Sequence, residues 1–268
     1  MRLRQITFAI VFCIFAASIT YAATKEERRV LDATDTLDQL LRIPEQGVPP
    51  LLLSRASAVA VVPRVIKVGF GLGARRGKGV LVVRQEDGSW SNPAFITLTG
   101  GSFGFQAGAQ SSDIILVFKT RASIDSIAQG KLTLGADASV AAGPVGRSAA
   151  AATDLTFKSE VFSYSRSRGL FAGVALEGAG LTMDRQANAA FYGSAQITPE
   201  QIFASSGNAA PEEANMFVQV LSTGTNQLPT RPSNAAVRSI EQPQPREQND
   251  SSVRTYGMNS NPDEDLKD

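Results

Sequence analysis

The chain has 268 residues, a formal net charge of +1, one cysteine and no histidine. The near-neutral charge does not favour nucleic-acid binding, and the lack of histidine removes Ser-His-Asp catalysis and the usual transition-metal ligand. The single cysteine leaves no disulfide and no zinc-thiolate site. Carboxylates, lysines and tyrosines remain available for catalysis, but the composition predicts a protein that is not an enzyme and needs no cofactor or metal.

The first residues carry the pattern of an export signal. Two arginines precede the uncharged apolar run at 6–20, and a small-x-small cleavage site ends at Ala22. This order predicts a cleaved signal peptide over 1–22 and a periplasmic or extracellular protein. The apolar run is shorter than the roughly 20 residues that span a bilayer, although an uncleaved anchor remains the alternative. Cys13 lies inside the run, behind Phe12, which argues against lipidation there.

Two helices are expected after the export signal. Apolar residues recur at helical spacing over 25–43 and predict an amphipathic helix that ends at Pro44. Acidic residues in its first turn suit the helix dipole. A short second helix is expected over 49–57, with a proline at its start.

The residue pattern then changes to that of β-strands. The β-branched run 58–62 predicts a strand closed by Pro63. Residues 65–73 and 79–84 predict a hairpin around an exposed basic turn, ARRGK at 74–78. A second turn, with an Asp-Gly pair, is expected in the sequence QEDGSW that follows this hairpin.

Further strands and helices follow at close spacing. Thr120 is expected to cap a helix over 121–129, and Thr198 with Gln201 predicts another helix start. The remaining strands are expected at 96–118, 131–143, 159–166, 170–177, 179–184 and 189–194, and a last helix from about Pro211. The sequence thus predicts a β-rich α+β fold, a curled antiparallel sheet or barrel-like sandwich with flanking N- and C-terminal helices. The Pro-rich, apolar-poor stretch 224–268 is predicted to be a disordered tail.

A basic, glycine-rich stretch is the first candidate site. The glycines of GFGLG at 69–73 lack the spacing and the following helix of a dinucleotide site, so they are better explained by close strand packing. Between residues 54 and 96 only Glu86 and Asp87 oppose seven basic residues, which are Arg55, Arg64, Lys67, Arg75, Arg76, Lys78 and Arg84. The ARRGK turn is therefore either a contact for an anionic head group or an ordinary solvated turn.

A second candidate site follows in GPVGR at 143–147 and SYSRSR at 163–168. Arg147 leaves a tight turn with a guanidinium fork suited to phosphate or carboxylate. Strand alternation places Tyr164, Arg166 and Arg168 on one face and the serines on the other. The two arginines either hold an anionic ligand or form ion pairs within the fold, with Asp137, Asp154 or Glu160 as partners.

Six segments, in order, resemble the SYLF domain, a lipid-binding module. They are IPEQ at 43–46, SRASAVAVVPRVIKVGFGLGARRGKGVLVVR at 54–84, DGSWSNPAFI at 87–96, LGADASVAAGPVGR at 134–147, YSRSRGLFAGVALEGAG at 164–180 and ANAAFYG at 187–193. The resemblance implies a β-rich domain over 23–223 that binds phosphoinositides and membranes, without enzymatic activity. Some family members bind actin, but the export signal argues against actin here and favours bacterial anionic lipids.

The sequence as a whole predicts peripheral, non-enzymatic binding of anionic phospholipid, of phosphatidylinositol type in the family, at the cell envelope. The predicted lipid-binding residues are Lys67, Arg75, Arg76, Lys78, Arg147, Arg166 and Arg168. By the same resemblance, the helix from residue 25 contacts lipid, with Lys25, Arg28 and Arg29 as weaker candidates. Two alternatives stay open: a structural or protein-interaction module of the envelope without lipid affinity, and an enzyme that uses carboxylates or tyrosine.

Overall fold

The computed structural model describes residues 23–42, 48–144, 159–167, 170–206 and 210–226. The chain divides into two compact units, Met1–Leu228 and Pro229–Asp268, and every described element belongs to the first. The predicted signal peptide, Arg147, Asp154, Arg168 and the predicted tail beyond residue 226 lie outside the described residues.

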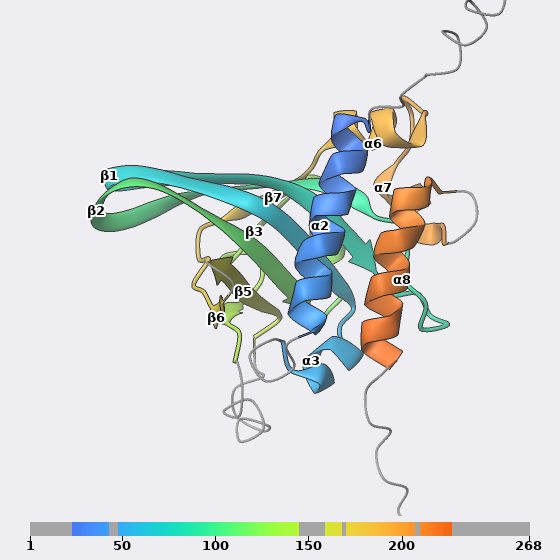
Figure 1. Ribbon diagram of the computed structural model, residues 1–268, viewed down its shortest axis with the longest axis horizontal. Coiled ribbons are helices and arrows are strands. Elements are labelled where there is room, and N and C mark those ends of the chain that lie inside the picture. Colours follow the sequence, from blue (N-terminus) through green and yellow to red (C-terminus); the bar gives the residue numbers. More distant parts are fainter. Residues whose placement is uncertain (1–22, 43–47, 145–158, 168–169, 207–209, 227–268) are drawn as a thin grey trace, which may run out of the picture. The chain divides into compact units, whose positions relative to one another are not determined.

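Helices stand at both ends of the described chain, with most strands between them (Figure 1). In chain order the elements are α2 (Lys25–Leu41), α3 (Pro50–Ser54), β1 (Ala58–Val83), β2 (Ala94–Phe118), α4 (Ala122–Gln129), β3 (Lys131–Thr133), β4 (Val140–Ala142), β5 (Val161–Ser167), β6 (Leu170–Gly173), β7 (Gly180–Met183), α6 (Arg185–Tyr192), α7 (Pro199–Ala204) and α8 (Glu212–Asn226). This arrangement confirms the predicted β-rich α+β fold with flanking helices.

A long antiparallel ribbon of β1 and β2 organises the sheet. Its register runs from Ala58 opposite Phe118 to Leu81 opposite Ala94. The second edge of β2 pairs with β7 near its start and with β5 near its end, while β3 extends β7, and β4 and β6 flank β5. Figure 1 shows the ribbon running away from the helices and doubling back, so the sheet is strongly curled.

Strand alternation divides the apolar side chains between two cores. Val59 and Val61 face α2, α3, α6 and α8 on the outer side of the sheet, where Leu37 of α2 is fully buried. Ala60 and Val62 face the inside of the curled sheet, which α4 helps to close. Period-two side-chain alternation is therefore what lets one strand serve both cores.

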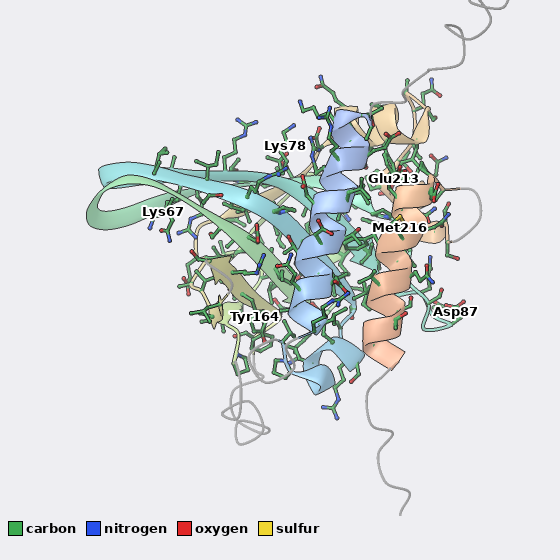
Figure 2. The ribbon with its side chains drawn as sticks, in the orientation of Figure 1. Lys67, Lys78, Asp87, Tyr164, Glu213 and Met216 are labelled. Atoms are coloured by element: carbon green, nitrogen blue, oxygen red, sulfur yellow. The ribbon has the colours of Figure 1, made fainter. Side chains whose placement is uncertain are left out.

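The predicted hairpin around ARRGK is wrong. Residues 74–78 lie within β1, and the turn that joins β1 to β2 follows Val83, where Figure 2 marks Asp87. Pro63 does not end the strand but stands at a register shift between Val62 and Val65, where Arg64 has a φ of 49°. A bulge tolerates a residue that cannot donate a ladder hydrogen bond.

The long strand β1 doubles back, so that its first part and its last part lie close together as two arms. This close approach explains the glycines in and beside the predicted turn. A Cβ at Gly77 would lie 2.6 Å from Val65 Cγ2, and a Cβ at Gly79 would lie 2.6 Å from Val62 Cα and overlap the Val61 carbonyl oxygen. The doubled-back strand therefore needs glycine here because no side chain fits between its arms.

The strand predicted at 189–194 is also wrong, because these residues lie largely in helix α6. Asp184 caps this helix by accepting a hydrogen bond from the Ala187 amide, and Gly193 ends it in the left-handed conformation. The predicted capping box at Thr198 and Gln201 is confirmed in α7. Helix α8 continues to Asn226, so it includes the first residues of the segment 224–268 that was predicted to be a disordered tail.

Candidate functional site

A surface cleft of about 430 Å³ lies between the two arms of β1. Its walls come from residues 64–68 on the outgoing arm and residues 74–78 on the returning arm. The lining residues are Arg64, Ile66, Val68, Ala74, Arg75, Arg76, Gly77 and Lys78. We call this cleft the β1 groove. It combines four basic residues with two branched apolar side chains.

The apolar part of the β1 groove is exposed to solvent. Ile66 and Val68 have 54% and 46% of their surface exposed, in contrast to the buried valines at the start of the strand. They lie on the same strand face as Arg64 because side chains alternate. Lys67, which Figure 2 labels, stands between them, so strand alternation places it on the opposite face, and it is not among the lining residues. The sequence analysis missed Ile66 and Val68, which the alternation of 64, 66 and 68 could have indicated.

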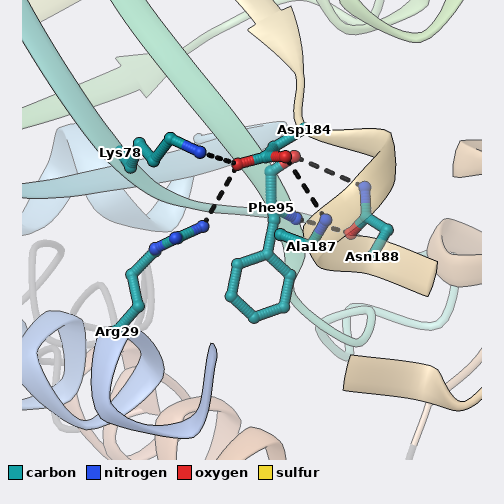
Figure 3. Close-up of polar contacts among 6 residues, drawn as sticks. All are labelled: Arg29, Lys78, Phe95, Asp184, Ala187 and Asn188. Carbon is teal, nitrogen blue, oxygen red and sulfur yellow. Dashed lines mark hydrogen bonds and ion pairs between the residues drawn. The ribbon is translucent and has the colours of Figure 1, made fainter. Parts of the chain in front are cut away.

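Lys78 belongs to a partly buried ion-pair network at the other end of the β1 groove. Its Nζ lies 2.7 Å from Asp184 Oδ2, and Arg29 Nη1 of α2 lies 3.3 Å from the same oxygen (Figure 3). Asp184 is also the N-cap of α6, and the Arg29 guanidinium lies 5.3 Å from the centroid of the Phe95 ring. The network joins α2, β1 and α6, so Lys78 and Arg29 both have a structural role.

Asp184 gives the network a pH dependence. Burial alone would raise the pKa of Asp184, but hydrogen bonds from Lys78 and the Ala187 amide, with the charges of Lys78 and Arg29, hold it below the ordinary value. A carboxyl group with a lowered pKa stabilises the fold above its unfolded pKa, near 4, and loses that contribution as pH falls through its folded pKa. We expect the wild-type midpoint temperature to fall below about pH 4, and to fall less in Asp184→Asn, as measured by thermal circular dichroism.

The three arginines of the β1 groove differ in their partners. Arg64 pairs with Asp32 of α2. Arg75 Nη1 donates to the Ala175 carbonyl at 3.4 Å, and its buried Nε has no hydrogen-bond partner among the described residues. Burial lowers the pKa of Arg75, although the charge of Glu177 opposes this shift. Arg76 is exposed and forms no ion pair within the described part of the chain, so it is the cation most available to a ligand.

Arg166 lies outside the lining of the β1 groove. Its Nη1 lies 3.2 Å from Asp113 Oδ2, and the two residues are direct cross-strand neighbours on β5 and β2. Arg166 therefore forms an ion pair within the fold, one of the two alternatives left open by the sequence, and its partner here is Asp113, which the sequence analysis did not name. Asp113 also accepts a hydrogen bond from the Arg64 amide at 2.9 Å, so Arg166 supports the bulge beside the groove.

Gly143 and Tyr164, from the second candidate site of the sequence analysis, have a packing role. Tyr164 is fully buried, and its hydroxyl donates to the Pro144 carbonyl at 3.3 Å. Burial raises the pKa of the Tyr164 hydroxyl. A Cβ at Gly143 would overlap the Tyr164 ring, so this glycine allows the chain to cross the aromatic face. Of the predicted site residues, the structure thus brings together Arg75, Arg76 and Lys78.

None of the helices in the described residues has both the length and the apolar character needed to cross a bilayer.

Comparison with known proteins defines the class of protein. Residues 99–223 match the Ysc84 family, described as "Las17-binding protein actin regulator". The curled strand-rich sheet, its flanking helices and this match agree, and the chain belongs to the Ysc84 family of SYLF-domain proteins.

Individual relatives align over much of this chain but over less of their own length. Protein YSC84 of Saccharomyces cerevisiae is 39% identical over 173 residues, which cover 63% of this chain and 36% of the relative. LAS seventeen-binding protein 3 of the same species is 36% identical over 200 residues, 74% of this chain and 42% of the relative. SH3 domain-containing YSC84-like protein 1 of Xenopus laevis is 32% identical over 224 residues, 83% of this chain and 66% of the relative.

Proposed function

We propose that this domain binds anionic phospholipid surfaces peripherally and without enzymatic activity, through the β1 groove. One observation carries the proposal: exposed Ile66 and Val68 share a cleft of about 430 Å³ with Arg64, Arg75 and Arg76. Apolar side chains beside cations are what a phospholipid interface requires, because the cations attract the head groups while the apolar groups enter the acyl boundary.

The magnitudes suit weak, reversible binding. Each basic residue near an anionic membrane surface contributes on the order of 1 kcal/mol, and each buried methylene about 0.8 kcal/mol. Arg64 and Lys78 already have carboxylate partners, so Arg76, with Arg75 beside it, is the main source of attraction. Two branched side chains and one or two cations give an affinity that depends on salt and on the charge of the lipid.

Vesicle flotation of residues 23–268 tests this function. We expect the protein to float with phosphatidylglycerol vesicles at 0.1 M salt, to float much less at 1 M salt, and to stay unbound with phosphatidylcholine. The reason is that the Debye length falls from about 10 Å to about 3 Å over this range of salt. Equal flotation with the charged and the neutral vesicles would contradict the proposal.

Export is part of the same proposal. The signal pattern at 1–22 favours cleavage after Ala22 and a location in the periplasm or outside the cell, peripherally bound to a membrane. We expect the protein extracted from the envelope to have the intact mass of residues 23–268 and an N-terminus at Ala23. A protein that still begins at Met1, or that carries lipid on Cys13, would contradict it.

A second candidate function is protein binding, and the relatives' names favour it. The matching family is described as Las17-binding, and the yeast relative LAS seventeen-binding protein 3 bears that description in its name. The chain spans about two fifths of the length of these yeast relatives, so their partners do not transfer directly. If the domain folds but binds neither anionic nor neutral vesicles, the result would favour a protein-interaction module of the envelope. The predicted export signal argues against actin as the partner of such a module.

A further inference from the structure

A second cavity, of about 410 Å³, lies where the connection from α3 to β1, the β1/β2 turn and the start of α4 meet. Its lining residues are Ser54, Arg55, Ala56, Ser57, Arg84, Gln85, Glu86 and Arg121. Three arginines therefore face one glutamate. None of them belongs to the β1 groove, and we call this cavity the arginine pocket.

Arg84 is the fixed part of the arginine pocket. Its three guanidinium nitrogens donate to backbone carbonyls, from Nε to Ala56 at 2.9 Å, from Nη2 to Leu53 at 3.0 Å and from Nη1 to Gly88 at 3.3 Å. The guanidinium also lies 4.3 Å from the centroid of the Trp90 ring. No carboxylate pairs with Arg84 among the described residues. Its burial lowers its pKa, which is the expected effect of moving a cation out of water.

Arg121 and Arg55 are the adaptable part of the arginine pocket. Arg121 Nη2 donates to the Arg84 carbonyl at 2.6 Å, which leaves most of its donors unused by that contact. Arg121 is also the N-cap of α4, where the helix dipole adds positive potential. Both Arg55 and Arg121 are exposed, and neither forms an ion pair within the part of the chain that the structure describes.

We propose that the arginine pocket binds a phosphate-bearing anion, which Arg55 and Arg121 contact directly while Arg84 maintains the positive potential behind them. Three arginines against one glutamate leave the cavity with a net positive charge, which a dianion would neutralise. Guanidinium forks match phosphate oxygens in two-point contacts. A volume of about 410 Å³ also leaves room for the group that carries the phosphate.

Titration of the purified full chain with inorganic phosphate at constant ionic strength tests the site. Arginine Nε–Hε resonances serve as the probe, and we expect saturable shifts for Arg55 and Arg121. Arg121→Gln and Arg55→Gln should each weaken binding roughly tenfold, because each removes one charge-assisted contact. Arg185→Gln, which removes an exposed arginine outside both the β1 groove and the arginine pocket, is the matched control and should leave phosphate binding unchanged. Arg84 is kept intact because it holds three backbone carbonyls.

A second experiment, with vesicles, distinguishes a soluble phosphate compound from a lipid head group as the ligand. In an Arg76→Glu background, which weakens the β1 groove, phosphatidic acid vesicles are compared with phosphatidylglycerol vesicles. Saturable shifts with inorganic phosphate support a soluble ligand. A preference for phosphatidic acid that Arg121→Gln abolishes, without shifts in free phosphate, supports a lipid phosphate. The absence of both effects overturns the proposal, and it leaves the function proposed for the β1 groove intact.

Discussion

Replacing Gly79 by alanine is expected to destabilise the protein by about 3 kcal/mol, the upper end of the usual cost of overpacking, because the added Cβ meets rigid backbone. The added Cβ would overlap the Val61 carbonyl oxygen and lie 2.6 Å from Val62 Cα. Both are backbone atoms of the opposite arm of β1, so no side-chain rotation can relieve the overlap. Urea unfolding followed by circular dichroism measures the loss.

Gly101→Ala is the matched control for this prediction. Gly101 is an exposed residue of β2, and a Cβ there would meet no atom within 4 Å. We expect this variant to unfold within about 0.5 kcal/mol of the wild type, because a surface substitution without a new contact has little effect. Similar stabilities for Gly79→Ala and Gly101→Ala would show that the arms of β1 are not closely packed.

Asp184→Asn is expected to lower the free energy of unfolding at pH 7 by about 3 kcal/mol, since breaking a buried ion pair leaves an uncompensated charge. Asparagine caps helices as well as aspartate does, so α6 keeps its N-cap and only the charge is lost. Arg29, with 9% of its side chain exposed, then lacks its carboxylate partner. Chemical unfolding at pH 7 measures the change.

Asp32→Asn is the control for the loss of one negative charge from an ion pair at the surface. Asp32 also joins α2 to β1, through Arg64, but this pair lies at the surface, with 69% of the Arg64 side chain exposed. Exposed ion pairs contribute at most about 1 kcal/mol. Equal losses in Asp184→Asn and Asp32→Asn would contradict a buried role for the Asp184 network.

Local sequence signals predicted most of the helices, although α6 was predicted as a strand and α4 lacks the expected Thr120 cap. The apolar spacing around Val30, Leu37 and Leu40 matches the buried face of α2, and the capping signal at Thr198 marks the start of α7. These signals act within one or two helical turns, where side-chain spacing and end capping determine the structure. The predicted helix 25–43 ends instead at Leu41, within the usual uncertainty of helix ends.

The doubled-back ribbon could not be predicted from local signals. Glycine and basic residues at 74–78 are typical of a turn, yet they lie within a strand because residues 61–65, on the opposite arm, approach their backbone. The contacts of the candidate site could not be predicted from local signals either. Arg75, Arg76 and Lys78 were predicted together from their adjacency, whereas the partner of Lys78, Asp184, stands 106 residues further along the chain. Only the folded sheet brings such residues into contact.

A matched pair of charge reversals tests the proposed lipid groove most directly. Arg76→Glu changes the exposed cation that lines the β1 groove, and Lys67→Glu makes the same change of charge on the opposite face of the same strand. Both variants are first shown to be folded by circular dichroism and are then compared with the wild type in flotation with phosphatidylglycerol vesicles. We expect Arg76→Glu to weaken binding roughly tenfold or more, from the loss of about 1 kcal/mol of attraction and the repulsion that replaces it, and Lys67→Glu to weaken it less than about threefold. Unchanged binding by Arg76→Glu, or equal losses in both variants, would contradict a membrane site in the β1 groove.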